Sequence, residues 1–352
     1  GEKKNPVFIG GGRTYLPSLA EEALAEGKCD FIFMGHGLLA EPHLVEYMEQ
    51  DRCEEVRPCI GCNLCADDQL SYNRHIRCSC NAVLGNGEND YTMEPAAVIK
   101  KVLVVGGGIA GMEAARTAAR RGHKVTLVEQ NDHLGGQLDY AVAPPYKDNL
   151  KQLYPYYEKQ LELNGVEVLL NTTADEAYVA SRKPDAVIWA CGVRPAVLPI
   201  PGFEKPIVSS AKEVLLGKTV GSHIVIIGGV GCETAELLLQ QGKTVTIVEM
   251  LDTLAGKMAA TTRSILMGHL KGHELKTYME CACREITDNG VVIEEKDGKK
   301  TEIVCDDVLI SIGDKPNNEL CERLKSLVPE FYNIGDSDKP DSFAASTLEP
   351  MA

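Results

Sequence analysis

The chain has 352 residues, of which 44% are hydrophobic and 25% are charged, and a formal net charge of −15 at pH 7. This length allows two or three domains with sizeable cores. The negative charge and the 5% aromatic content argue against a nucleic-acid partner, because a phosphate backbone attracts basic surfaces and unpaired bases stack on aromatic rings. We find no apolar run long enough to span a membrane and no secretory leader pattern. Thirteen cysteines in a large chain favour a metal or cluster site in a reducing cytoplasm over a disulfide framework.

Residues 1–50 have the pattern of two βα units. The short apolar strands are "NPVFIGGG" and "CDFIFMGHG", and the helices are "PSLAEEALAEG" and "EPHLVEYMEQD". Apolar strands that alternate with helices predict parallel pairing. Two units alone leave open sheet edges, so we expect a partner or a further segment to complete them.

A cluster of cysteines follows in "RPCIGCNLCADDQLSYNRHIRCSC". Cys59, Cys62, Cys65 and Cys78 have the spacing C-x2-C-x2-C-x12-C, which lets thiolates from one loop face a common cavity, as a [4Fe–4S] cluster requires. Structural zinc also accepts four thiolates, but it usually joins two separate CxxC knuckles, so it is the alternative. Cys80 lies close enough in sequence to replace Cys78 as a ligand.

A glycine-rich turn follows the apolar strand in "KKVLVVGGGIAGMEAARTAARRGHKVTLVEQ". Gly106, Gly108 and Gly111 form the GxGxxG pattern between a strand and a helix, where the helix N-terminus can bind a pyrophosphate. Glu129 ends the next strand, where a carboxylate can accept hydrogen bonds from ribose hydroxyls. This segment predicts a dinucleotide-binding domain.

A similar unit recurs about 120 residues later in "SHIVIIGGVGCETAELLLQQGKTVTIVEM", with Gly228, Gly229 and Gly231 in its turn and Glu249 at the end of its second strand. The repeat predicts two dinucleotide-binding domains in tandem. An acidic residue at that position suits NADH better than NADPH, because it repels a 2′-phosphate. The second turn is two residues shorter than the first, so the alternative is a domain that keeps its shape without its ligand.

The remaining cysteines carry no clear redox motif. Cys191 and Cys305 lie in apolar strands and are expected to be buried. Cys232 lies near a helix start, where the pKa of a thiol can fall, but we expect it to pack in the core rather than to take part in catalysis. Cys281 and Cys283 form a CxC pair, which lacks the spacing of a disulfide reductase.

The order of "CIGCNLC", "IRCSCNA", the first glycine turn and "LGGQL" strongly resembles the family of 2-enoate reductases, 2,4-dienoyl-CoA reductases and trimethylamine dehydrogenase. The chain resembles the C-terminal part of those enzymes. The resemblance implies an α/β fold with the last two βα units of a TIM barrel, an iron–sulfur loop, and tandem Rossmann-like FAD and NAD(P) domains. The implied boundaries are 1–50 for the barrel part, 51–98 for the cluster segment, 99–215 with 303–352 for the FAD domain, and 216–302 for the NAD(P)H domain.

The resemblance also implies roles for individual residues. Those that would ligate the cluster are Cys59, Cys62, Cys65 and Cys78. Those that would meet FAD are Gly106, Gly108, Gly111, Glu129, Gly136, Gln137, Gly335 and Asp336. Those that would face an FMN phosphate are Arg13, Gly35 and His36, although the family usually has arginine at the position of His36. The first six barrel units are not in this sequence, so the FMN site is expected to be partial, and the chain to be a fragment, a processed product, one subunit of a split enzyme or a chain with internal residues missing.

The expected function is electron transfer from NADH through FAD and a [4Fe–4S] cluster to an FMN site that reduces an activated alkene, such as an enoate or enoyl thioester. Two alternatives remain, a non-catalytic electron-transfer subunit and a pyridine-nucleotide disulfide reductase. We also expect a homo- or hetero-oligomer that acts on a small molecule.

Overall fold

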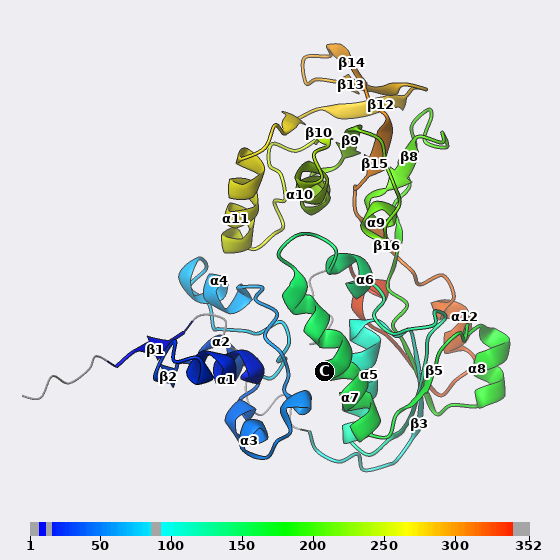
Figure 1. Cartoon of the computed structure of the whole chain (residues 1–352). Helices are drawn as coiled ribbons and strands as arrows, with labels where there is room; N and C mark the ends of the chain where they lie inside the picture. The colour runs from blue at the N-terminus through cyan, green and yellow to red at the C-terminus, as the bar shows by residue number, and fades with distance from the viewer. Residues whose placement is uncertain (1–6, 12–15, 86–92, 341–352) are drawn as a thin grey trace, which may run out of the picture. The chain divides into compact units, whose positions relative to one another are not determined.

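The structure is a computed structural model, and it describes residues 7–11, 16–85 and 93–340. The chain divides into two compact units: unit 1 comprises residues 1–136, 149–192 and 318–352, and unit 2 comprises residues 137–148 and 193–317. Figure 1 labels their helices and strands. No helix in the described ranges is long and apolar enough to cross a membrane.

Unit 1 begins with the two expected βα units. Strands β1 (Ile9–Gly10) and β2 (Phe31–Ile32) pair in parallel. The helices around them are α1 (Pro17–Ala25), α2 (His36–Ala40) and α3 (Leu44–Glu49). Phe8, Phe31 and Phe33 are each more than half exposed, so this strand pair presents an uncovered apolar face within the described residues.

The cysteine segment also belongs to unit 1 and contains little regular structure. Its elements are η1 (Cys53–Glu55) and α4 (Leu64–Leu70). Gln160 on α7 (Leu153–Leu163) donates to the carbonyl oxygen of Glu55 at 3.4 Å. The segment therefore contacts a helix of the large sheet that follows it in the chain.

The large sheet of unit 1 is fully parallel, with the order β17-β6-β3-β4-β5. Its strands are β3 (Lys101–Val105), β4 (Lys124–Val128), β5 (Glu167–Leu169), β6 (Ala186–Trp189) and β17 (Glu330–Asn333). The other helical elements of this region are α5 (Ile109–Arg120), η2 (Asp148–Gln152), α8 (Glu176–Arg182), α12 (Cys321–Lys325) and η4 (Gly335–Ser337). Small residues such as Ala114 and Ala115 are fully buried on α5, which lets this helix lie close to the sheet.

Unit 2 contains a second parallel five-stranded sheet, with the order β11-β10-β9-β15-β8. Its strands are β8 (Val208–Ser210), β9 (His223–Ile227), β10 (Thr244–Val248), β11 (Lys276–Tyr278) and β15 (Asp307–Ile310). The helical elements are α6 (Leu138–Ala141), α9 (Ala211–Leu215), η3 (Gly229–Gly231), α10 (Cys232–Gln240) and α11 (Ala260–Lys271). An antiparallel sheet joins β12 (Ala282–Ile286), β13 (Gly290–Glu294) and β14 (Lys300–Val304), and β7 (Val193–Pro195) pairs with β16 (Asp314–Pro316).

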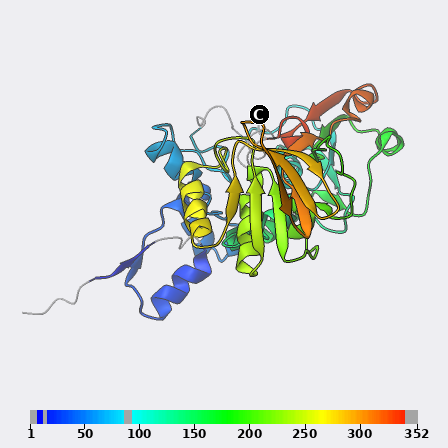
Figure 2. The same cartoon turned by 90° about the horizontal axis from the view of Figure 1, so that it is seen from above.

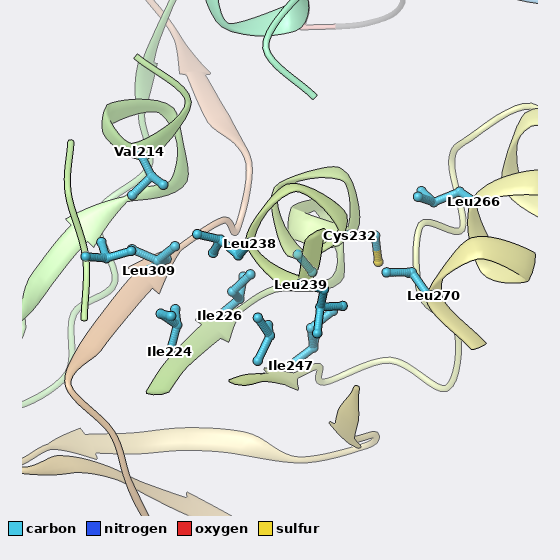
Figure 3. Packing of buried hydrophobic residues seen from close by; sticks show 13 residues of the cluster. Val214, Ile224, Ile226, Cys232, Leu238, Leu239, Ile247, Leu266, Leu270 and Leu309 are labelled. Atoms are coloured by element: carbon cyan, nitrogen blue, oxygen red, sulfur yellow. The ribbon is translucent and has the colours of Figure 1, made fainter. Parts of the chain in front are cut away.

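The sequence of strand β9 is apolar because both faces of the strand are buried. Ile224 and Ile226 point into the hydrophobic cluster on the α10 side of the sheet (Figure 3), because alternate side chains point to opposite faces of a strand. Val225 and Ile227 point to the other face and pack against the β12–β14 sheet (Figure 2, orange). Both faces of this sheet are therefore covered, as in other parallel sheets.

The division of the chain differs from the expected domain boundaries. Strands β8 and β15 join the sheet of β9, whereas the expected boundaries assigned them to the FAD domain. The reason is long-range pairing: Val308 on β15 lies opposite Val225 on β9 and opposite Val208 on β8. Short apolar strands carry no local signal for the sheet that they join.

Candidate cofactor-binding sites

The first glycine turn connects β3 to α5 in unit 1. Gly106 has a φ of +106°, and a Cβ atom there would lie 2.4 Å from the carbonyl oxygen of Ala190. A Cβ atom on Gly111 would lie 1.9 Å from the carbonyl oxygen of Gly106. Gly108 is the N-cap residue of α5. The three glycines therefore bring the main chain to the helix N-terminus, whose free N–H groups and positive dipole end suit a phosphate.

Glu129 lies beside this turn, directly after β4. Its side chain is buried, and its two carboxylate oxygens accept hydrogen bonds from the main-chain N–H groups of Gly107 at 2.7 Å and Asn131 at 2.8 Å. These two bonds fix the carboxylate next to the glycine turn. Each oxygen keeps a further lone pair that can accept a ribose hydroxyl.

Two further segments of unit 1 lie against the turn. The "LGGQL" segment joins it where Gly135 donates to the carbonyl oxygen of Gly107 at 3.0 Å, and a Cβ atom on Gly136 would lie 3.1 Å from the Cα atom of Gly108. A Cβ atom on Gly335 would lie 2.7 Å from the Cβ atom of Ala110.

Gln137 and Asp336 directly follow two of these glycines in the chain. The structure thus brings the segments of the expected FAD residues of unit 1 to one turn. Their contact with FAD stays a prediction.

The second glycine turn, in unit 2, has the same hydrogen bonds. The N–H of Gly228 donates to the carbonyl oxygen of Val248 at 2.9 Å, as the N–H of Gly106 does to that of Val128. Glu249 accepts from the N–H groups of Gly229 at 2.5 Å and Leu251 at 2.7 Å. The carboxylate at the end of β10 is therefore held like the one at the end of β4.

The two-residue shortening changes the start of the helix. The turn continues through η3, in which Gly231 donates to the carbonyl oxygen of Gly228 at 3.1 Å, before α10 begins at Cys232. The Cys232 thiol is fully buried, donates to the carbonyl oxygen of Gly229 at 3.0 Å, and has its pKa raised to about 12 by burial. These observations confirm that Cys232 packs in the core.

The four cysteines of the C-x2-C-x2-C-x12-C pattern line one small cavity, together with Ser79 and Cys80. Gly61 and Asn63 have φ values of +68° and +60°, so the chain turns sharply between consecutive thiols. The four thiols are Cys59, Cys62, Cys65 and Cys78. Burial raises the pKa of Cys59 to about 11, and the charges of the other three thiols act in the same direction, which shows how closely they are grouped.

Cys78 is the member of this group that favours the thiolate. The Cys80 thiol donates a hydrogen bond to it and lowers the pKa of Cys78 to about 6, with help from main-chain N–H groups and the positive charge of Arg57. The same hydrogen bond and burial raise the pKa of Cys80 well above its usual value. Both thiols line the cavity, so the assignment of Cys78 as the fourth ligand stays a prediction.

The donor set suits an iron–sulfur cluster. Four thiols line one cavity, and a cubane cluster would present a different iron atom to each of them.

The cysteine segment is braced by side chains that the motif analysis did not single out. Arg77 donates two hydrogen bonds of 2.9 Å to the carboxylate of Asp68, which joins the residue before Cys78 to helix α4. Arg57 donates to the hydroxyl of Tyr156 at 3.1 Å and to the carbonyl oxygen of Ala40 at 3.4 Å.

The expected FMN residues have a mixed outcome. Arg13 lies outside the described residues. Gly35 is the N-cap residue of α2, and His36 begins that helix. His36 also lines the cavity of the four thiols, a position that the sequence analysis did not anticipate. Whether Gly35 and His36 meet an FMN phosphate stays a prediction.

Two parallel sheets, each with a glycine turn and a carboxylate at the end of the next strand, define the class of oxidoreductases with tandem FAD- and NAD(P)-binding domains. Residues 100–330 match the family described as pyridine nucleotide-disulphide oxidoreductase, and the chain belongs to this family.

Curated relatives and solved structures extend the match beyond these residues. The NADH oxidase of Thermoanaerobacter brockii is 39% identical over 334 residues, which cover 91% of this chain and 51% of the relative. The cinnamate reductase of Clostridium sporogenes is 37% identical over 338 residues, which cover 94% of this chain and 50% of the relative. A structure of 2-naphthoyl-CoA reductase in complex with 2-naphthoyl-CoA superposes with a TM-score of 0.94 and 30% identity, over 99% of this chain and 53% of the other.

The chain spans about half the length of the curated relatives it matches. These matches confirm the resemblance to the C-terminal part of the enoate and dienoyl-CoA reductase family, and with it the expected fold class.

Proposed function

We propose that this chain is the nucleotide- and cluster-binding part of a reductase, in which FAD and a [4Fe–4S] cluster relay electrons from NADH to an FMN site that reduces an activated alkene. The observation that carries the proposal is the presence, in one compact unit, of a cavity lined by four thiols and of a complete FAD-type glycine turn. A one-electron centre beside a flavin is a natural relay, because a flavin accepts electrons in a pair and releases them singly.

In this proposal, the residues of unit 1 hold and orient FAD. Gly106, Gly108 and Gly111 let the pyrophosphate approach the N-terminus of α5, and Glu129 accepts hydrogen bonds from the ribose. Gly335 lies against the first turn of the same helix, which supports a second contact near Asp336.

The residues of unit 2 would hold NADH across the second sheet. Glu249 at the end of β10 suits the free 2′-hydroxyl of the adenosine half. On the other side of β9, a cavity of about 450 Å³ lies at the carboxyl ends of β8 and β15 and is lined by Ser210, Lys212, Ser311 and Asp314 among others. A dinucleotide bound across the sheet would put its nicotinamide half on this side, and the cavity supports that placement.

The four cysteines Cys59, Cys62, Cys65 and Cys78 would ligate the cluster. The thirteen free thiols of the chain support a reducing, cytoplasmic site of action. The protein's contribution at this site is to exclude water and to orient donors towards the sulfur atoms.

The rest of a barrel, in another segment or a partner subunit of an oligomer, would cover the exposed apolar strand pair of β1 and β2 and complete the FMN site with Arg13, Gly35 and His36. Cinnamate and 2-naphthoyl-CoA, the compounds in the names of two similar reductases, are an unsaturated carboxylate and an aromatic thioester. Their names support a substrate with an unsaturated bond next to a carboxyl or thioester group.

Two alternatives have less support. A non-catalytic electron-transfer subunit would need a second turn that binds no NADH, and the shortened helix start at Gly231 is the feature that favours it. A disulfide reductase would need a reactive dithiol. Cys281 and Cys283 are both buried in unit 2, and burial raises the pKa of each.

Thermal unfolding with added nucleotide tests the proposal. NADH should raise the melting temperature more than NADPH does, and Glu249→Arg should abolish or reverse this preference, because it exchanges a carboxylate for a cation at the 2′-position. Glu302→Arg is the matched control, since it makes the same charge change at an exposed position of β14. Failure of both nucleotides to protect the wild type would overturn the NADH assignment.

A further inference from the structure

Ser79 is a buried polar residue in contact with one of the four clustered thiols. The residue is only 4% exposed, and its hydroxyl oxygen lies 3.2 Å from the sulfur atom of Cys62. Ser79 directly follows Cys78, the last cysteine of the motif, and its hydroxyl contacts Cys62, which belongs to the three-cysteine loop.

The direction of this hydrogen bond depends on the state of the sulfur atom. In the free protein either atom can donate. A thiolate bound to iron carries no proton, so the hydroxyl must then be the donor and the sulfur atom the acceptor. This step rests on the proposed function, which makes Cys62 a cluster ligand.

Hydrogen bonds to the sulfur atoms of an iron–sulfur cluster favour its reduced state. Reduction adds one negative charge, which spreads onto the sulfur atoms, and a donor that points at a sulfur atom stabilises the more negative form more strongly. The effect is larger in a buried site, where water does not screen it.

We propose that Ser79 is a positioning residue that raises the reduction potential of the cluster through its hydroxyl hydrogen bond to Cys62. The site then accepts electrons more readily than the four thiolates alone would allow.

Other groups near the thiols are less suited to a test of how one side chain changes the reduction potential. Cys80 donates to the sulfur atom of Cys78 through its thiol and, at 3.4 Å, through its main-chain N–H, but the thiol is itself an alternative cluster ligand and the N–H belongs to the backbone. Arg57 contributes a positive charge, yet its guanidinium also bonds Tyr156 and Ala40 and so braces the fold. The Ser79 hydroxyl is a single polar atom beside a ligand, so it can be removed with little change in volume.

The test is a redox titration of the holoprotein, purified without oxygen and followed by the electron paramagnetic resonance signal of the reduced cluster. Ser79→Ala should keep the iron and sulfide content of the wild type. At the applied potential that half-reduces the wild type, its ratio of reduced to oxidised cluster should fall about tenfold, which corresponds to about 59 mV for a one-electron couple. Ser79→Thr, which keeps the hydroxyl, should restore the wild-type potential.

The matched control is Ser71→Ala, which removes a hydroxyl of the same segment that bonds Asp67 rather than a thiol and should leave the potential unchanged. If Ser79→Ala does not retain the cluster, the comparison is made between Ser79→Thr and Ser79→Val, because valine has nearly the shape of threonine but no hydroxyl. Only the valine variant should then have a reduction potential below that of the wild type. A wild-type potential in a loaded alanine or valine variant overturns the proposal, and so does loss of the cluster in all three variants. Absence of an iron–sulfur signal in the wild type would instead overturn the proposed function.

Discussion

The bidentate ion pair between Asp68 and Arg77 should decide whether the cysteine segment keeps its shape. Asp68 lies on α4, three residues after Cys65, and Arg77 directly precedes Cys78. The change Arg77→Met removes both hydrogen bonds while it keeps a side chain of similar length. It leaves the carboxylate of Asp68 buried without its cation.

The size of the effect follows from the burial of the two partners. The Asp68 side chain is 1% exposed and that of Arg77 is 36% exposed. Breaking a fully buried pair costs about 3–5 kcal/mol, and the partial exposure of Arg77 reduces this to about 2–3 kcal/mol, or roughly 30- to 150-fold in a folding equilibrium. Because the pair joins the two ends of the thiol motif, we expect the loss to appear as weaker cluster retention.

The assay is the iron content per chain after anaerobic reconstitution and desalting, together with the melting temperature. The matched control is Arg52→Met, which breaks another bidentate pair of the same segment, with Glu55, in which the arginine is more exposed. That pair should contribute about 1 kcal/mol or less. Equal iron retention and equal melting temperatures for the two variants would show that the Asp68–Arg77 pair does not hold the cysteine segment in shape.

Three further predictions follow from buried groups. Gly111→Ala should abolish FAD binding and destabilise unit 1, because its Cβ atom would lie 1.9 Å from a main-chain carbonyl oxygen. The control is Gly268→Ala on α11, where no atom lies within 4 Å of the added Cβ atom. In thermal melts, this control should be neutral or stabilise the protein by about 0.5–1 kcal/mol. Glu113→Gln should cost about 3–5 kcal/mol in urea unfolding, because it leaves the fully buried Arg116 without its anion, and exchanging both for apolar residues should cost less than the single change. Burial raises the pKa of Cys232 to about 12 from an ordinary value of 9.0. The contribution of this thiol to the free energy of unfolding is therefore complete below about pH 9 and is lost as the pH rises towards 12. Mass spectrometry should find the thiol unalkylated in the native protein at pH 8, about one unit below its ordinary pKa, and rapid alkylation there would contradict its burial.

The features that the sequence predicted well depend on local requirements of the chain. Gly106 and Gly228 each follow a strand, adopt a positive φ and approach a carbonyl oxygen of a neighbouring strand end, so only glycine fits. Glu129 and Glu249 each lie 18 residues after the last glycine of the turn, which is Gly111 in the first and Gly231 in the second. Such spacing can be read from the sequence without knowledge of the rest of the fold.

The features that the sequence did not predict depend on contacts between distant segments. Arg57 bonds Tyr156, which lies 99 residues later in the chain, and no motif links the two. The sheet that β8 and β15 join is likewise set by pairing with β9. Within the cysteine segment, the motif pattern does not single out Ser79 or Asp68, and their burial is seen only in the structure.

In the proposed relay, NADH delivers electrons to a flavin and a cluster held by this chain. The most direct test is the absorption spectrum of the purified holoprotein under anaerobic conditions, before and after the addition of NADH. We expect flavin bands over a broad iron–sulfur shoulder, both of which bleach with NADH. A flavin and cluster spectrum that NADH leaves unchanged would contradict the relay.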